Sequence, residues 1–176
     1  MPIELDKFIR DVPDFPKPGI LFRDITPLLS DSRAFRHACY AIADQFWNRQ
    51  VNLVAGPESR GFLFGTGVAL ELNLGLVPLR KPGKLPWQKI SQSYALEYGE
   101  DSLEMHLDAV VPGAKVLIVD DLLATGGTAA ACVELVRKAG GEVVGSAFLV
   151  ELAGLGGRKP IEDMGVEVFS LLSYED

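Results

Sequence analysis

The sequence has little of what membrane and secreted proteins need. Only two of its 176 residues are cysteines, Cys39 and Cys132, and they show no metal-type spacing. No apolar run approaches the roughly 18 residues of a membrane span, and no signal-peptide pattern opens the chain. We therefore expect a cytoplasmic protein with no membrane partner, in which both thiols are buried and reduced.

Positive charge is also scarce. The formal net charge is −7, from 17 Lys and Arg against 24 Asp and Glu, whereas non-specific nucleic-acid binding needs a basic surface. No nucleic-acid partner is therefore expected, although a phosphorylated small molecule would respond only to local donors. Two common phosphate motifs are missing: there is no Gly-x-x-x-x-Gly-Lys-Ser/Thr, and residues 61–67 lack the Gly-x-Gly-x-x-Gly spacing.

What is present is the pattern of an α/β domain. Hydrophobic residues make up 48% and charged residues 23% of the chain, as in soluble globular proteins. The expected helices span about residues 32–47, 61–73 and 127–139, and the expected strands span 52–55, 76–79, 115–119, 142–151 and 166–172. This alternation predicts a single domain with a parallel-rich central sheet flanked by helices, and ligands bind such sheets at the C-terminal strand edge.

The stretch 115–131 carries the clearest site. A buried strand pattern is followed by Asp120 and Asp121, where the strand would emerge, and then by a Thr- and Gly-rich loop before a helix near Gly127. Free backbone N–H groups and the helix dipole make such a turn an anion site. The two carboxylates would repel a bare phosphate, so the ligand should bring a cation or present sugar hydroxyls. An ordinary turn with solvated acids is the alternative interpretation.

Cationic side chains follow two other strands. Ser59 and Arg60 stand at a helix start, where they either hold an anion or form an N-cap with an exposed arginine. Arg80, Lys81 and Lys84 form a basic cluster after the strand at 76–79. This cluster either serves solubility or binds a polyanionic group such as pyrophosphate.

Two segments lack a regular pattern. Residues 17–27 are loop-like but apolar, so they either pin Leu21 and Phe22 into the core or cover a flat aromatic ligand. Residues 82–106 form the longest segment without clear periodicity, which indicates a functional lid or a disordered link. Within it, Tyr94–Gly99 alternates enough to form one strand of a mobile hairpin.

Four separated motifs together resemble the adenine family of the type I phosphoribosyltransferases over nearly the whole chain. They are Phe22-Arg-Asp-Ile, Glu58-Ser-Arg-Gly, Lys84-Leu-Pro with Tyr94-Ala-Leu-Glu-Tyr-Gly, and the 116–131 stretch, which resembles the phosphoribosyl pyrophosphate (PRPP) motif. The resemblance implies the type I fold over 1–176, with a base-side hood at 1–30 and a flexible catalytic loop at 82–106. It also implies conversion of adenine and PRPP to AMP and pyrophosphate, with Mg²⁺, by a homodimer.

The resemblance also implies a role for each matching residue. The implied 5′-phosphate ligands are Ala124, Thr125, Gly126, Gly127 and Thr128, and the implied ribose and Mg²⁺ ligands are Asp120 and Asp121. The implied pyrophosphate ligands are Glu58, Ser59, Arg60, Arg80, Lys81 and Lys84, with a cis peptide before Ser59. Adenine would lie between Phe22 and Leu152, with the backbone of Leu21 and Arg23 along its edge, and Tyr94 and Tyr98 would belong to the lid.

Position 124 bears on which base is used. Related enzymes for hypoxanthine and guanine carry an acid there that handles the base proton, which Ala124 cannot do. The resemblance therefore makes Glu97, in the lid, the candidate for this role. Two other functions stay open. A transferase for another purine is opposed by Ala124 and by the Tyr94–Gly99 motif. A PRPP-sensing regulator is opposed by the presence of Glu97 and by the acidic composition.

Overall fold

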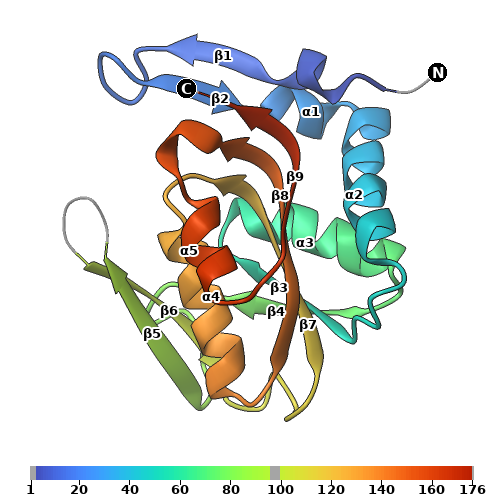
Figure 1. Cartoon of the computed structure of the whole chain (residues 1–176), viewed down its shortest axis with the longest axis vertical. Coiled ribbons are helices and arrows are strands. Elements are labelled where there is room, and N and C mark those ends of the chain that lie inside the picture. The colour runs from blue at the N-terminus through green and yellow to red at the C-terminus, as the bar shows by residue number, and fades with distance from the viewer. Residues whose placement is uncertain (1–2, 96–99, 176) are drawn as a thin grey trace.

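The chain forms an α/β fold built on a parallel sheet of five strands, in the order β4–β3–β7–β8–β9. The computed structural model describes residues 3–95 and 100–175 (Figure 1). In sheet order the strands are Gly75–Leu79, Leu53–Pro57, Lys115–Leu123, Glu142–Leu152 and Val168–Tyr174. The predicted parallel α/β architecture is confirmed, and β7 lies at its centre.

Helices cover both faces of the sheet (Figure 1). The helices α2 (Ser32–Phe46) and α3 (Arg60–Glu71) pack on one face, and α4 (Gly127–Lys138) and α5 (Arg158–Asp163) lie on the other. Successive residues of β7 alternate between these two cores: Val116 and Ile118 face the α4 side, whereas Leu117 and Val119 face the α2 side. This double burial explains why β7 reads as a continuous apolar run.

The predicted helix at about residues 32–47 is confirmed, and it begins with a side-chain cap. The Asp31 side chain accepts hydrogen bonds from the backbone N–H groups of Arg33 (3.0 Å) and Ala34 (2.9 Å), which begins α2. Its buried face includes Ile42 and Phe46, both fully inaccessible to solvent. Cys39 and Cys132 are buried free thiols, as predicted. Among the described residues, no helix is both long and apolar enough to cross a bilayer.

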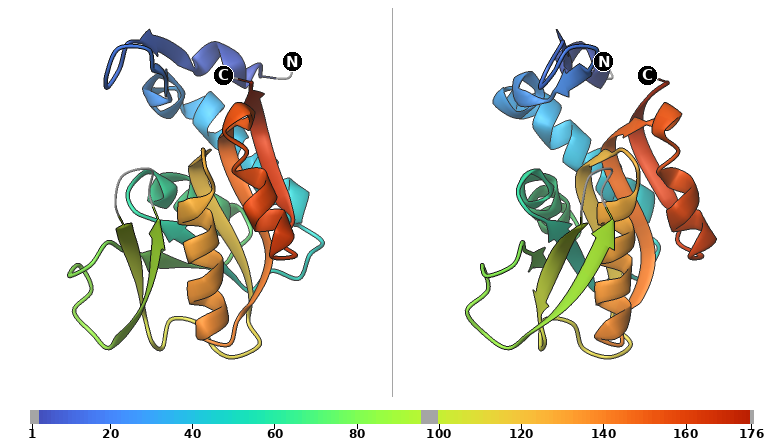
Figure 2. Two further views of the ribbon diagram at one scale, coloured as in Figure 1. Left: turned by 60° about the vertical axis from the view of Figure 1, so that its left-hand side comes forward. Right: turned by 90° about the vertical axis from the view of Figure 1, so that its left-hand side faces the viewer.

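Residues 3–30 form a small layer, here called the hood, over the C-terminal edge of the sheet (Figure 2). It contains a 3₁₀ helix at Leu5–Phe8, the antiparallel strands β1 (Arg10–Pro13) and β2 (Leu21–Asp24), and the short helix α1 (Thr26–Ser30). The sequence predicted only a loop over most of 17–27. The strand β2 was missed because Pro16 and Pro18 break the local pattern between it and its ladder partner β1, which itself ends at Pro13.

The described part of the segment 82–106 contains two paired strands, β5 (Lys89–Ala95) and β6 (Glu100–His106), and β5 packs against α4. Of the hairpin strand predicted at 94–99, Tyr94 and Ala95 belong to β5, and residues 96–99 lie outside the described residues. Alternate residues of β5, among them Ile90 and Tyr94, are partly buried and contact the core. The polar Gln92 lies on this same partly buried face, so the strand is only weakly amphipathic and the sequence did not predict both strands.

The last third of the chain differs from expectation in one element. No helix was predicted between the strands at 142–151 and 166–172, but residues 153–157 contain a 3₁₀ helix at Ala153–Leu155 and lead directly into α5. Only Ile161 of α5 is buried, so six residues gave no helical periodicity to detect. The final strand occurs as predicted but ends at Tyr174 rather than Leu172.

Candidate active site

The C-terminal edge of the sheet brings together the loops after β3, β4 and β7. Arg80 follows β4 directly, as the sequence predicted, whereas β3 continues past its predicted end at residue 55 to Pro57, so that Glu58 follows it directly. The strand β7, however, runs through Asp120 and Asp121 to Leu123, so its predicted end at residue 119 was wrong. Its ladder with β8 continues to Leu123, which holds both acids in extended backbone at the mouth of the site.

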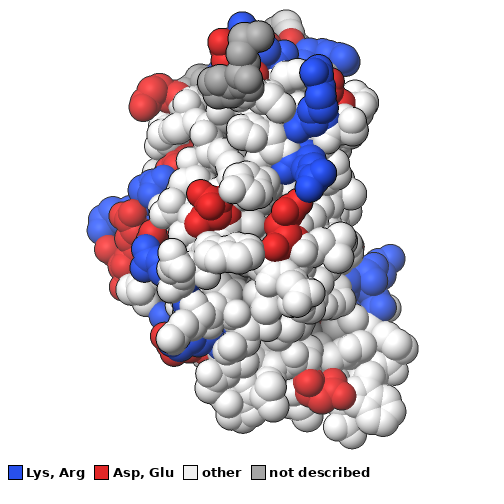
Figure 3. Space-filling model, turned by 90° about the vertical axis from the view of Figure 1, so that its right-hand side faces the viewer, with Lys and Arg blue, Asp and Glu red and all other residues white. Residues whose placement is uncertain are grey.

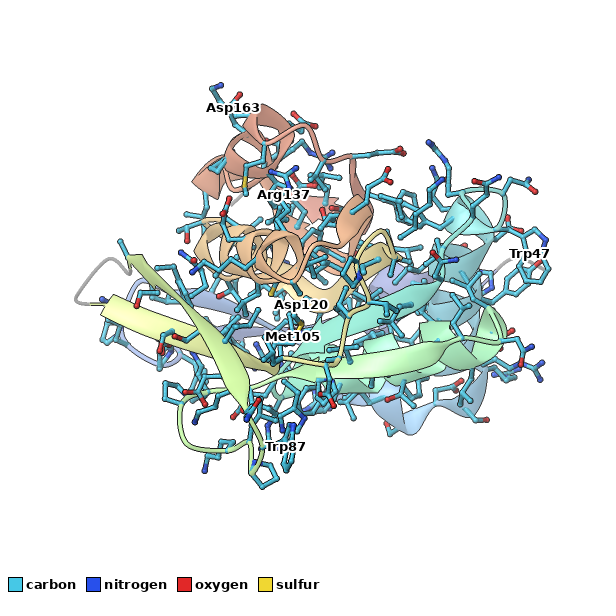
Figure 4. All side chains as sticks on the ribbon, turned by 90° about the horizontal axis from the view of Figure 1, so that it is seen from below. Trp47, Trp87, Met105, Asp120, Arg137 and Asp163 are labelled. Atoms are coloured by element: carbon cyan, nitrogen blue, oxygen red, sulfur yellow. The ribbon has the colours of Figure 1, made fainter. Side chains whose placement is uncertain are left out.

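A cavity of about 340 Å³ opens at this edge. Most of the predicted PRPP-binding residues line it, from three elements that are distant in sequence. Its lining is Glu58, Ser59, Arg60, Lys81, Tyr94, Leu103, Asp120, Asp121, Leu122, Leu123, Ala124, Thr125, Gly126, Gly127, Thr128 and Ala129. The peptide bond between Glu58 and Ser59 is cis, as the resemblance implied. In the view from below, Asp120 lies near the centre of the molecule, whereas Trp47 and Trp87 lie at its periphery (Figure 4).

The two acids have different environments. Burial raises the pKa of Asp120 well above its ordinary value, and the adjacent Asp121 raises it further. Asp121 forms an ion pair with the Arg60 guanidinium, a contact that joins β7 to the start of α3. A Cβ on Gly61 would lie 2.8 Å from Asp120 Oδ1, so only glycine lets α3 approach this carboxylate. Asp121 is therefore held beside a cation, and Asp120 lies against the start of α3.

The predicted basic cluster is divided between two roles. The Arg80 Nε and the Lys81 backbone N–H each donate to Glu58 Oε2 at 2.8 Å. Burial raises the pKa of Glu58, but these donors outweigh it and leave the pKa below its ordinary value. Within the described part of the chain, Lys81 lines the cavity while Arg80 and Lys84 do not. The Glu58 carboxylate thus fixes the position of Arg80 and Lys81, the segment that follows β4.

Lys81 joins the hairpin to the Thr- and Gly-rich loop. Its Nζ forms an ion pair with Asp101 and lies 3.0 Å from the Tyr94 hydroxyl. Thr128 Oγ1 lies 3.4 Å from the same hydroxyl, at the start of α4. Hydrogen bonding to Lys81 lowers the pKa of Asp101. This network holds the predicted lid residue Tyr94 against the Thr- and Gly-rich loop.

A second, more apolar cavity of about 190 Å³ lies under the hood. All four residues that the resemblance assigned to adenine line it: Leu21, Phe22, Arg23 and Leu152. Sequence reasoning missed the other apolar lining residues, which are Ile20, Ile25, Leu122 and Val150, because nothing in their local pattern marks them as part of a site. Arg60, Asp121 and Leu122 line both cavities, so the two sites are adjacent.

The donor set at the larger cavity suits Mg²⁺ only in part. Asp120 and Asp121 offer hard oxygen ligands, but no group of three His, Cys, Asp or Glu side chains that could hold a metal exists among the described residues. Mg²⁺ is commonly held by one or two carboxylates together with substrate phosphates. The residues therefore fit a metal that arrives with a diphosphate.

Two predicted residues, Glu97 and Tyr98, lie outside the described residues. The sequence also gave no sign of Asp101, which holds Lys81, or of the contact between Arg60 and Asp121. Each depends on residues that are brought together only by the sheet. The excess of acidic residues in the sequence indicates that Lys81 and Arg60 would each find a carboxylate partner, but it does not identify Asp101 or Asp121 as that partner.

Comparison with known proteins agrees with this geometry. Residues 28–175 match the phosphoribosyl transferase domain family. The chain is 57% identical to the adenine phosphoribosyltransferase of Sodalis glossinidius over 94% of this chain and 91% of that one. A crystal structure of adenine phosphoribosyltransferase from Thermoanaerobacter pseudethanolicus superimposes with a TM-score of 0.93 at 51% identity, covering 97% of this chain and 98% of that chain.

A third match includes ligands. The Saccharomyces cerevisiae adenine phosphoribosyltransferase, complexed with D-2,5-dideoxy-2,5-imino-altritol 1,6-bisphosphate and adenine, has a TM-score of 0.89 at 39% identity, covering 96% and 97% of the two chains. The fold and the cavity edge thus define a type I phosphoribosyltransferase. Within that class, the chain belongs to the adenine phosphoribosyltransferases, the purine-salvage enzymes that convert adenine and PRPP to AMP and pyrophosphate.

Proposed function

We propose that the larger cavity binds PRPP and the smaller cavity binds adenine, so that the base meets ribose C1 where the two join. The observation that carries this assignment is the shared wall of Arg60, Asp121 and Leu122. One cavity is polar and rich in backbone donors, whereas the other is mainly apolar and flanked by Phe22. A phosphorylated sugar and a planar base suit these two linings respectively.

The proposed PRPP site has three parts. The backbone from Ala124 to Thr128, with its threonine hydroxyls, receives the 5′-phosphate at the start of α4. Asp120 and Asp121 accept hydrogen bonds from the ribose hydroxyls. The pyrophosphate lies beside Ser59, Arg60 and Lys81, while Arg80 and the exposed Lys84 contribute charge from further out.

Mg²⁺ is proposed to be held mainly by the PRPP oxygens, near Asp120 and Asp121, where it would help to neutralise the charge on the departing pyrophosphate. The chain's own residues have separate tasks. Arg60 and Lys81 stabilise that charge with fixed cations. Residues 124–128, here called the phosphate loop, contact the β5–β6 hairpin through Tyr94, and this hairpin limits the access of water to ribose C1.

Adenine needs to lose a proton as its N9 bonds to ribose C1. Ala124 cannot accept it, so we propose that Glu97 does. Glu97→Gln should lower kcat by about a hundredfold or more, within the usual contribution of a positioned base. Near-normal turnover by a correctly folded Glu97→Gln protein would exclude this role.

The function is tested by incubating the protein with adenine, PRPP and Mg²⁺ and measuring AMP and pyrophosphate. We expect equal amounts of the two products and little reaction with hypoxanthine. Preference for hypoxanthine would contradict the adenine assignment. Tight PRPP binding without AMP formation would instead indicate a sensor.

The proposed assembly is a homodimer. Leu63 and Leu70 on α3 are 42% and 74% exposed, and Tyr40 on the neighbouring α2 is 53% exposed. This side of the molecule carries few charged side chains over a broad area (Figure 3), which favours a protein partner. Sedimentation at several concentrations should give a dimer, and Leu70→Glu should give a monomer. A cytoplasmic location is also proposed, because both cysteines are buried free thiols.

A further inference from the structure

One glycine outside every predicted motif touches the phosphate loop. Gly157 lies between the 3₁₀ helix Ala153–Leu155 and α5, in the segment that follows β8. A Cβ placed on Gly157 would lie 2.2 Å from the Ala124 carbonyl oxygen and 2.7 Å from the Gly126 backbone nitrogen. These atoms belong to the loop that opens α4. Two stretches of backbone therefore meet here with no side chain between them.

The contact is reciprocal. A Cβ on Gly126 would lie 2.4 Å from the Gly157 carbonyl oxygen. Gly126 also has φ +85°, which favours glycine on its own account. Gly157, by contrast, has φ −66° and ψ −17°, ordinary helical values that any residue adopts. Position 157 therefore requires glycine for space alone, and the space it leaves is filled by the phosphate loop.

The segment that carries Gly157 is firmly attached to the sheet. The next residue, Arg158, donates from Nε to Glu151 Oε1 (3.0 Å) and from Nη2 to Glu151 Oε2 (2.5 Å). Its Nη1 donates to the Val168 carbonyl at 2.8 Å. The Glu151 side chain is only 6% exposed. A two-pronged ion pair thus fixes the turn to β8 and β9, and Gly157 cannot move away from the loop independently.

We infer that Gly157 is a positioning residue for PRPP: its backbone supports residues 124–126 from behind and holds their N–H groups in the arrangement that binds the 5′-phosphate. The inference rests on the proposed role of that loop. Gly157 itself does not line the PRPP cavity. Its effect is on where the loop backbone lies, because two packed backbones leave the loop no room to retreat.

The direct test is Gly157→Ala. The added methyl group cannot fit without displacing the loop, so we expect KM for PRPP and Kd for ribose 5-phosphate to rise by about tenfold to a hundredfold, the loss of one hydrogen bond to a charged group. KM for adenine at saturating PRPP should change less than about threefold. Calorimetric titration with ribose 5-phosphate measures the binding without catalysis.

Gly156→Ala is the matched control. Gly156 has φ +68°, so alanine strains the same turn, but nothing lies within 4 Å of its added Cβ. We expect this variant to lose thermal stability while keeping the parental Kd for ribose 5-phosphate. Equal weakening of binding in both variants would show that general damage to the turn is responsible. A stability loss in Gly157→Ala with unchanged Kd would likewise overturn the inference.

Two further variants keep the test decisive. If Gly157→Ala does not fold, Arg158→Lys keeps the charge but loses the two-pronged fork, and a rise in Kd for ribose 5-phosphate of about threefold or more is expected. An unchanged Kd for ribose 5-phosphate in Arg158→Lys would contradict the inference.

Thr128→Val separates this inference from the assignment of the loop as the phosphate site. Unchanged binding in Thr128→Val would exclude the loop as the phosphate site, whereas weakening there but not in Gly157→Ala would exclude only the support from Gly157.

Discussion

The guanidinium carbon of Arg23 lies 4.0 Å from the centroid of the Tyr174 ring. Tyr174 is the last residue of β9, and Arg23 belongs to β2 in the hood. The Tyr174 hydroxyl also donates to Asp6 Oδ1 at 2.6 Å, and Arg23 Nη1 donates to Asp11 Oδ1 at 2.5 Å. The end of the chain thus holds the hood through a cation–π contact and a hydrogen bond. Because Arg23 lines the smaller cavity, this contact helps to fix the shape of the base pocket.

We expect Tyr174→Leu to weaken adenine binding. Loss of the aromatic face removes the cation–π contribution of about 0.5–2 kcal/mol, which corresponds to a rise in KM for adenine of about twofold to thirtyfold. KM for PRPP should stay near the parental value, because Tyr174 does not line the larger cavity. Initial rates at saturating PRPP over a range of adenine concentrations measure the effect.

Tyr174→Phe is the control for this prediction. It keeps the ring over Arg23 and loses only the hydrogen bond to Asp6, so its KM for adenine should rise less than that of Tyr174→Leu. If the leucine variant folds normally and has the parental KM for adenine, the Arg23–Tyr174 contact does not shape the pocket.

Lys81 and Lys84 should contribute unequally to pyrophosphate binding. Lys81 lines the larger cavity, whereas Lys84 is exposed and does not. Lys81→Met should raise KM for PRPP and the inhibition constant of pyrophosphate by about tenfold to a hundredfold, the value of a hydrogen bond to a charged group. Lys84→Met should change both by less than about threefold, because its charge acts through solvent. Similar effects of the two substitutions would contradict the proposed geometry.

Local chemistry explains how much the sequence predicted. The acids, the phosphate loop and the helix start of 115–131 are consecutive in the chain, so their meaning can be read without knowing the fold. The alternation of strands and helices can also be recognised along the chain without knowing the fold, and it predicted the parallel sheet. The apolar, loop-like segment 17–27 left two interpretations of Phe22 open, a core position or a cover over an aromatic ligand. The distant Leu152 came only from family resemblance. Both residues line one cavity.

Long-range contacts explain the rest. The Arg60–Asp121 ion pair and the β1–β2 hairpin depend on which residues the fold brings together. The same holds for Gly157, whose backbone conformation is ordinary and whose special property is the approach of another chain segment. Propensity and periodicity report each residue's own preferences, so such contacts left no local signal.

Gly61 should be intolerant of alanine. A Cβ there would lie 2.8 Å from Asp120 Oδ1 and 2.9 Å from Pro57 Cδ. Gly61→Ala should lower the free energy of unfolding by about 1–3 kcal/mol, typical of overpacking, and lower kcat/KM for PRPP by displacing Asp120. In Gly75→Ala the nearest atom is Leu53 Cδ1 at 3.4 Å, an ordinary contact, so activity should be retained. Urea denaturation and initial rates distinguish the two, and equal activity in both would refute the prediction.

Acid should selectively weaken the Glu151–Arg158 contact. Burial raises the pKa of Glu151, but the hydrogen bonds and charge of Arg158 outweigh it and leave the pKa below its ordinary value. Below about pH 4.3, the ordinary pKa of a glutamate, the unfolded chain therefore binds more protons than the folded one. The contribution of this carboxylate is complete above that pH and is lost as the pH falls through the folded-state pKa.

Glu151→Gln isolates this contribution. At pH 7 it should lower the free energy of unfolding by about 1–3 kcal/mol, and the difference from the parent should shrink as the pH falls below about 4.3. Asp120, whose raised pKa gives the opposite slope, is present in both proteins and cancels in the difference. Glu162 lies 3.5 Å from Arg158 Nη1 but is 52% exposed, so Glu162→Gln should cost less than about 1 kcal/mol. Urea denaturation from pH 7 to pH 3 measures both variants, and a Glu151→Gln difference that stays constant over this range would contradict the linkage.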